Sequence, residues 1–97
     1  MYALASARLI SCRVDQANEM FSCLDEAIAK VKNHPGEAIR IIGYAKSEPG
    51  AGKRIAVSFR RQLIDALIKQ GDQVDESLFK SVDGGVIGEA RIEVYAD

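Results

Sequence analysis

Two runs of apolar residues with helical spacing, separated by segments rich in β-branched residues, most strongly constrain how this chain can fold. Over residues 17–31, apolar side chains recur at intervals of three and four, which predicts an amphipathic helix. The same spacing recurs over residues 55–70. Pro35 and Gly36 follow the first run, and Gly71 follows the second. These residues favour the end of a helix.

Strands are predicted around these helices. Residues 38–45 are rich in β-branched residues, residues 7–14 alternate loosely, and residues 90–96 place Ile92 and Val94 on one face. These patterns are typical of strands. A short helical turn is expected around residues 75–80, and a turn is expected at residues 83–85, which read Asp-Gly-Gly. The predicted order is therefore strand, helix, strand, helix, strand.

This order predicts one α/β (α+β) domain over residues 1–97, a two-layer sandwich with the helices packed on one face of a small mixed sheet. The 97 residues suffice for one domain with one core. The side chains expected in the core come from both helices and two of the strands: Phe21, Leu24, Ile28, Ile41, Leu63, Leu67 and Ile92.

The cysteines and the histidine give no reason to expect a metal or another cofactor. Cys12 and Cys23 match neither a zinc-binding spacing nor a redox CxxC motif. We expect both to be free thiols, because one bridge is not needed to hold a core of this size. His34 precedes Pro35, and its position is that of a residue at the end of a helix.

Charge is unevenly distributed along the chain. The net charge is −1, yet residues 46–61 contain five cations and a single carboxylate, Glu48. A basic patch of this kind can receive an anionic group, and it is equally typical of a solvated loop and helix face. Nucleic acid is not an expected partner, because the domain is not basic overall and no aromatic residues interleave the cations.

The stretch SEPGAGKR resembles a nucleotide-binding P-loop only in part. The motif reads G-x-x-x-x-G-K-[ST] and opens into a helix. Gly52 and Lys53 match it, but Ser47 stands at the first glycine and Arg54 at the hydroxyl residue. We therefore expect residues 46–54 to form a mobile surface turn without nucleotide affinity. The spacing of the remaining polar residues predicts no catalytic group.

Three segments resemble the C-terminal OmpA-like domain: IRIIGYA, then LIDALIKQG after a loop, and ARIEVY at the end. The resemblance covers most of the chain and implies a non-catalytic periplasmic or outer-membrane-associated module. Domains of that family hold the diaminopimelate group of peptidoglycan, with an aspartate on the amine and an arginine on a carboxylate. Such opposed charges give charge-assisted hydrogen bonds to a zwitterionic ligand.

The chain departs from that pattern at the ligand-binding positions. Lys46 stands where the aspartate is expected, and Arg54 stands where the family has asparagine. Aligned from GYA, Arg61 takes the place of the arginine. Aligned back from Gly71, which fits slightly better, Phe59 does. The candidate residues of this degenerate site are all cations: Lys46, Arg54, Arg60 and Arg61.

The resemblance therefore leads to a scaffold or partner-binding module in a cell-envelope assembly, such as a secretion or pilus machine. Its partners would be other envelope proteins, and membrane association would come only through other parts of a parent protein. One alternative is a genuine peptidoglycan anchor that uses the basic patch to bind stem-peptide carboxylates. The other alternative, a small enzyme or nucleotide-binding domain, has little support in the residues.

Overall fold

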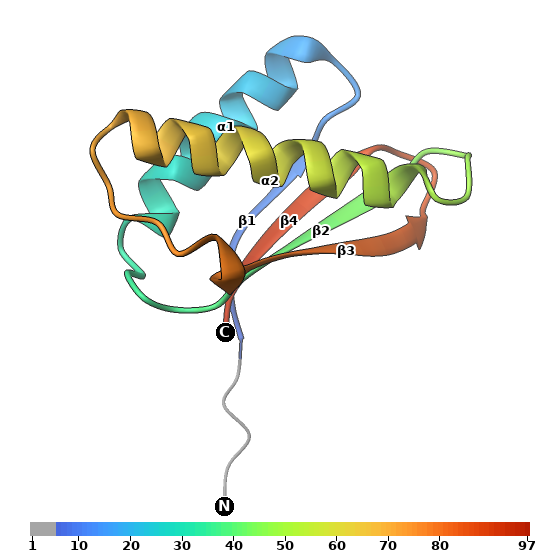
Figure 1. Ribbon diagram of the computed structural model, residues 1–97. Coiled ribbons are helices and arrows are strands. Elements are labelled where there is room, and N and C mark those ends of the chain that lie inside the picture. Colours follow the sequence, from blue (N-terminus) through green and yellow to red (C-terminus); the bar gives the residue numbers. More distant parts are fainter. Residues whose placement is uncertain (1–5) are drawn as a thin grey trace, which may run out of the picture.

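Two helices lie on the same face of a four-stranded sheet, which confirms the predicted two-layer α+β arrangement (Figure 1). The structure is a computed structural model that describes residues 6–97, so the first five residues of the predicted domain lie outside the described part. The elements, in chain order, are β1 (Ala7–Arg13), α1 (Ala17–Val31), β2 (Ile39–Ala45), α2 (Ala51–Lys69), a 3-10 turn (Glu76–Leu78), β3 (Phe79–Val86) and β4 (Arg91–Ala96).

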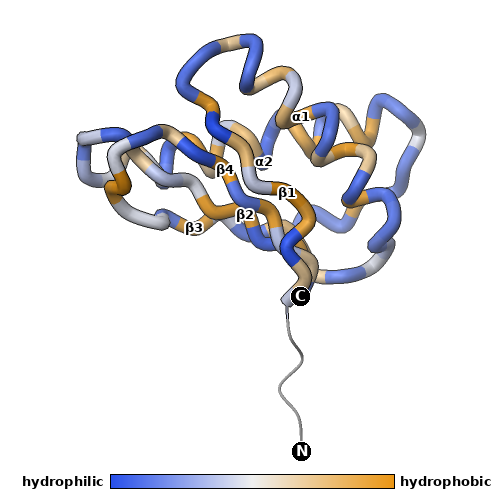
Figure 2. The backbone as a smooth tube through the Cα atoms, turned by 180° about the vertical axis from the view of Figure 1, so that it is seen from behind, coloured by the Kyte–Doolittle hydropathy of each residue, from blue (hydrophilic) through white to orange (hydrophobic). Residues whose placement is uncertain are grey.

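The strands lie in the order β1-β4-β2-β3. Helix α2 crosses over from β2 to β3, and these two strands are parallel, as expected for such a connection. Strand β4 lies between β1 and β2 and is antiparallel to both. In Figure 2, blue hydrophilic and orange hydrophobic stretches are interspersed along the strands. Buried residues alternate with less buried ones along β2 and β4, because one face of the sheet packs on the helices and the other does not.

Strand β3 was not predicted, and the turn expected at residues 83–85 is wrong. Asp83 and the two glycines that follow are ordinarily turn residues, but here they continue the edge strand past a shift in register opposite Gly43 and Tyr44. Gly84 lies against the ring of Tyr44, and a Cβ atom at this position would be 2.4 Å from Cε1 of that ring. The glycine is therefore needed for the packing of a neighbouring strand.

The core is confirmed for the sheet and for α2. Ile41, Leu63, Leu67 and Ile92 are all at most 3% exposed. Phe59 is also fully buried, as expected from the spacing of the second apolar run.

The buried face of α1 differs from the predicted one. Phe21 is 67% exposed, and Leu24 and Ile28 are only partly buried against the core. The residues that α1 buries are Cys23, Ala27 and Val31, four residues apart. The prediction gave too much weight to the largest apolar side chains, and the placement of Phe21 in the core is wrong.

A disulfide joins Cys12 on β1 to Cys23 on α1, so the prediction of free thiols is wrong. The two Cα atoms are 5.9 Å apart, within the range that a bridge requires. Cys23 is 1% exposed and belongs to the core. The bridge thus fastens the first helix to an edge strand of the sheet.

We predict that reduction of this bridge lowers the free energy of unfolding by about 3 kcal/mol, because the bridge closes a short loop in the unfolded chain. Urea unfolding with and without dithiothreitol measures the difference. A double variant, Cys12→Ala with Cys23→Ala, is the control, and its stability should not respond to the reductant. Two alkylated thiols per unreduced wild-type chain would contradict the bridge.

Candidate functional site

The candidate site begins where β2 and α2 meet, at a contact between two glycines. A Cβ atom on Gly43 would lie 2.1 Å from the carbonyl oxygen of Gly52, and one on Gly52 would lie 2.3 Å from that of Gly43. Such distances are too short for any larger residue. Gly52, which matched the second glycine of a P-loop, is thus required for close packing of the helix on the strand.

Helix α2 begins at Ala51, four residues earlier than predicted, so the surface turn expected over residues 46–54 is wrong for its last four positions. Gly50 precedes the helix with a φ of 88°, a left-handed conformation that glycine adopts without strain. Lys53 and Arg54 therefore lie in the first turn of α2, and only residues 46–50 form the connection from β2.

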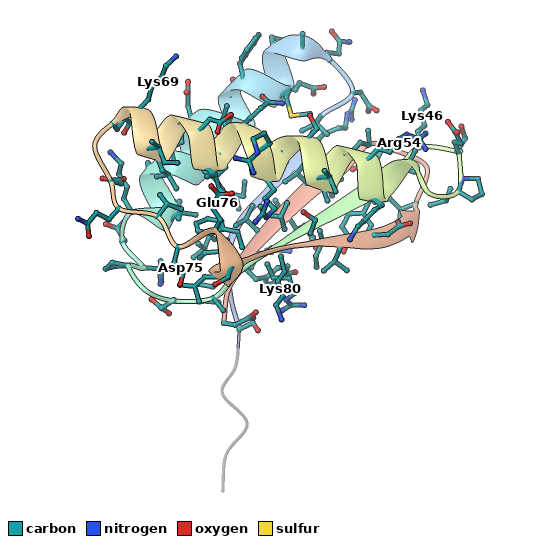
Figure 3. All side chains as sticks on the ribbon, viewed as in Figure 1. Lys46, Arg54, Lys69, Asp75, Glu76 and Lys80 are labelled. Carbon is teal, nitrogen blue, oxygen red and sulfur yellow. A yellow bond between two sulfur atoms is a disulfide. The ribbon has the colours of Figure 1, made fainter. Side chains whose placement is uncertain are left out.

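The four predicted site residues do not converge on one point. Lys46 follows the end of β2, and Arg54 lies at the same end of the molecule (Figure 3). Arg54 forms an ion pair with Glu48, with a nitrogen–oxygen distance of 3.1 Å. Both side chains are largely exposed, and ion pairs of that kind contribute little to stability.

Arg60 lies further along α2 and binds backbone. Its Nε donates to the carbonyl oxygen of Phe79 at 2.7 Å, and a terminal nitrogen donates to that of Glu76 at 2.7 Å. Lys53 makes a similar contact, because its Nζ donates to the carbonyl oxygen of Ser81 at 2.7 Å. Phe79 and Ser81 are two residues apart on β3, so their carbonyl groups point to the same side of the strand.

Arg61 is bound by carboxylates. One of its terminal nitrogens lies 2.9 Å from Glu76 and the other lies 3.3 Å from Asp65. The hydrogen bond to Glu76, followed by that to Asp65, raises the pKa of the Arg61 guanidinium above its usual value. Of the four predicted cations, Lys46 alone has no ion pair or side-chain hydrogen bond with the residues in the described range 6–97.

The contacts of Lys53 and Arg60 have a clear structural effect, because β3 is an edge strand. Unpaired backbone groups on an edge are a template for pairing with another chain, and charged side chains commonly block them. Here two cations from α2 occupy two carbonyl groups of β3. Part of the basic segment, residues 46–61, therefore covers the edge of the sheet.

A polar cluster on the other face of the sheet was not singled out from the sequence. Glu93 on β4 accepts hydrogen bonds from the hydroxyl groups of Tyr44 at 2.8 Å and Tyr95 at 3.1 Å. Arg40 lies over the ring of Tyr95, 4.9 Å from its centroid. Burial first, and then the bond to Glu93, raise the pKa of both tyrosines, so both hydroxyls remain protonated donors at neutral pH.

Alternation along β4 was the signal for this cluster, since it places Glu93 and Tyr95 on the face away from the helices. That Tyr44 and Arg40 of β2 lie beside them depends on the order of the strands, which alternation within β4 does not reveal. Because the carboxylate already accepts from two hydroxyl groups, the cluster is suited to holding the strands together. Within residues 6–97, no group of three or more histidine, cysteine or carboxylate side chains is placed to hold a metal ion.

We predict that removing the cations on the edge promotes self-association. The double variant Lys53→Ala with Arg60→Ala should show a rising weight-average mass with concentration in sedimentation equilibrium, because carbonyl groups of β3 become free to pair. Arg54→Ala with Arg61→Ala removes the same charge and leaves those contacts in place, so it should behave as the wild type. Equal association of both double variants would contradict the assignment.

Comparison with models of known protein families gives no match to this chain, and a comparison with curated proteins gives none either. Among the helices of residues 6–97, none has the length and apolar character needed to cross a membrane. The resemblance to the OmpA-like domain therefore remains a prediction from the residues that carry it.

Proposed function

We propose that the chain is a divergent OmpA-like module of the cell envelope that acts as a scaffold or partner-binding component and has a degenerate peptidoglycan site. One observation carries the proposal. Three of the four cations that would face a peptidoglycan stem peptide are engaged by carboxylate or carbonyl groups of the domain itself. An incoming carboxylate would have to displace those groups.

The position after β2 also supports the proposal. The resemblance implies an aspartate there that engages the amine of diaminopimelate, but the residue is Lys46. Two like charges repel, so this end of the site disfavours the amine. The lysine is exposed in the connection to α2.

Both alignments of the second helix lead to a weakened arginine position. In the alignment from Gly71 the position falls on Phe59, which lies on the core-facing side of α2 and is fully buried. In the alignment from GYA it falls on Arg61, whose guanidinium is bound by Glu76 and Asp65. In the first case the position carries no guanidinium, and in the second a carboxylate of the ligand competes with Glu76 and Asp65.

The disulfide is consistent with the proposed location. Bridges form and persist in oxidising compartments such as the periplasm and are rare in the cytosol. The bridge between Cys12 and Cys23 links a strand of the sheet to a helix of the other layer, so the folded domain benefits from such a compartment. These features fit a small module of the cell envelope that binds other proteins.

Purified sacculi test the proposal in a sedimentation assay at low and physiological ionic strength. We expect weak retention of the wild type that salt abolishes, because any residual attraction comes from exposed cations and is screened. Lys46→Asp should increase retention if the GYA alignment holds, since it restores an anion for the ligand amine. Lys69→Asp makes the same change of charge at the far end of α2 (Figure 3) and should not.

Strong retention of the wild type at physiological ionic strength would overturn the scaffold assignment. That result would instead favour the peptidoglycan anchor, with the basic segment exchanging its internal partners for stem-peptide carboxylates.

A further inference from the structure

A cleft lies at the opposite end of β2 from Lys46, between the C-terminal ends of the two helices and the 3-10 turn that precedes β3. Its volume is about 370 Å³, which is within the range of sites that bind small ligands or inserted side chains. Two surface segments border it, residues 32–37 after α1 and residues 72–75 after α2. These segments are the green and orange loops at the lower left of Figure 1.

The floor of the cleft is apolar. Val31, Ile39, Leu67 and Phe79 line it, and each is at most 8% exposed. Val74 and Leu78, which are partly buried, complete the apolar lining. An apolar group that enters the cleft leaves water and gains contact with these side chains, which favours binding in proportion to the area buried.

The rim of the cleft is acidic. Three carboxylates line it, from Glu37, Asp72 and Asp75, against one lysine, Lys32. Lys32 lies 4.0 Å from Asp72, and Nδ1 of His34 lies 2.7 Å from Glu37. Leaving His34 out of the count, the carboxylates and the lysine of the lining sum to a charge of −2.

Within residues 6–97, Asp75 has no ion-pair partner, whereas Asp72 pairs with Lys32 and Glu37 contacts His34. Its Oδ1 accepts from the backbone nitrogen of Ser77 at 3.0 Å and from the Ser77 hydroxyl at 2.6 Å. These bonds lower the pKa of Asp75, so the group is ionised at neutral pH. It lies beside the 3-10 turn, on the outside of the domain (Figure 3).

The two helices add to this negative potential. Val31 is the last residue of α1, and Leu67 lies in the last turn of α2. Both C-terminal ends therefore border the cleft. The C-terminal end of a helix carries a partial negative charge that favours cations, so the backbone and the rim carboxylates act in the same sense.

We propose that this cleft binds a segment of a partner protein that inserts one large apolar side chain and places a lysine or arginine next to it, against Asp75. An apolar floor combined with an acidic rim at two helix C-termini is complementary to a segment that is both cationic and apolar. A peptide suits the opening, because the bordering segments extend along the surface on both sides. The inference rests on the proposed partner-binding role and identifies the surface that binds the partner.

Three capped tripeptides test the inference by NMR titration of the ¹⁵N-labelled domain: Lys-Leu-Lys, Glu-Leu-Glu and Lys-Ser-Lys. We expect Lys-Leu-Lys to shift the amide signals of the cleft residues. Glu-Leu-Glu should bind about fivefold more weakly or worse because its charges repel the rim. Lys-Ser-Lys should bind about tenfold more weakly because it lacks the apolar side chain.

Two charge variants localise the effect. Asp75→Asn retains an acceptor for Ser77 and should weaken Lys-Leu-Lys binding about threefold to fivefold. Glu48→Gln makes the same change of charge at the other end of β2 and should leave it unchanged. Val74→Lys, at a partly buried position of the lining, should abolish the shifts while the remaining spectrum stays dispersed.

Equal shifts from all three peptides, shifts outside the cleft, or no shifts at all would each overturn the inference. The sacculus assay probes the other end of the sheet, so its outcome is independent of this titration. Retention on sacculi with normal peptide binding would contradict the peptidoglycan part of the proposed function alone. Loss of peptide binding with weak sacculus retention would contradict only the cleft.

Discussion

The contact between Gly43 and Gly52 determines how α2 lies on the sheet. Each glycine leaves space for the carbonyl group of the other, and a methyl group at either position would meet backbone at about 2 Å. This close approach lets Ala56, Phe59 and Leu63 be fully buried on the same helix face. It also determines which groups of the domain the cations on the other faces of α2 can contact. The position of the basic segment is therefore a consequence of backbone packing.

Once α2 is held in this way, its basic residues find partners within the domain. Lys53 and Arg60 extend to carbonyl groups of the edge strand, and Arg61 extends to carboxylates beside the 3-10 turn. Hydrogen bonds with charged donors are stronger than neutral ones, and here they protect an edge that would otherwise be open. The same residues that suggested an anion site thus have a structural role.

The sequence was enough to predict the two layers, but not which strands and side chains lie next to one another. Helical spacing predicted both helices, and β-branched segments predicted three strands. Strand β3 was missed because Asp83 and the two glycines after it have turn chemistry, and the need for Gly84 arises only when Tyr44 packs across it. The bridge was missed for a similar reason, since the separation of Cys12 and Cys23 depends on how α1 lies on β1. The cleft joins segments from four parts of the chain, and no local pattern indicates it.

If the cations of the basic segment stabilise the fold, they are little available to a peptidoglycan ligand. NMR signals of the arginine Nε–H groups test this most directly, recorded while a stem peptide containing diaminopimelate is added at low salt. We expect the Arg60 Nε–H to exchange slowly with solvent and not to shift, because it donates to the carbonyl oxygen of Phe79. Rapid exchange, together with a saturable shift of the Arg60 and Arg61 signals on addition of the peptide, would contradict it.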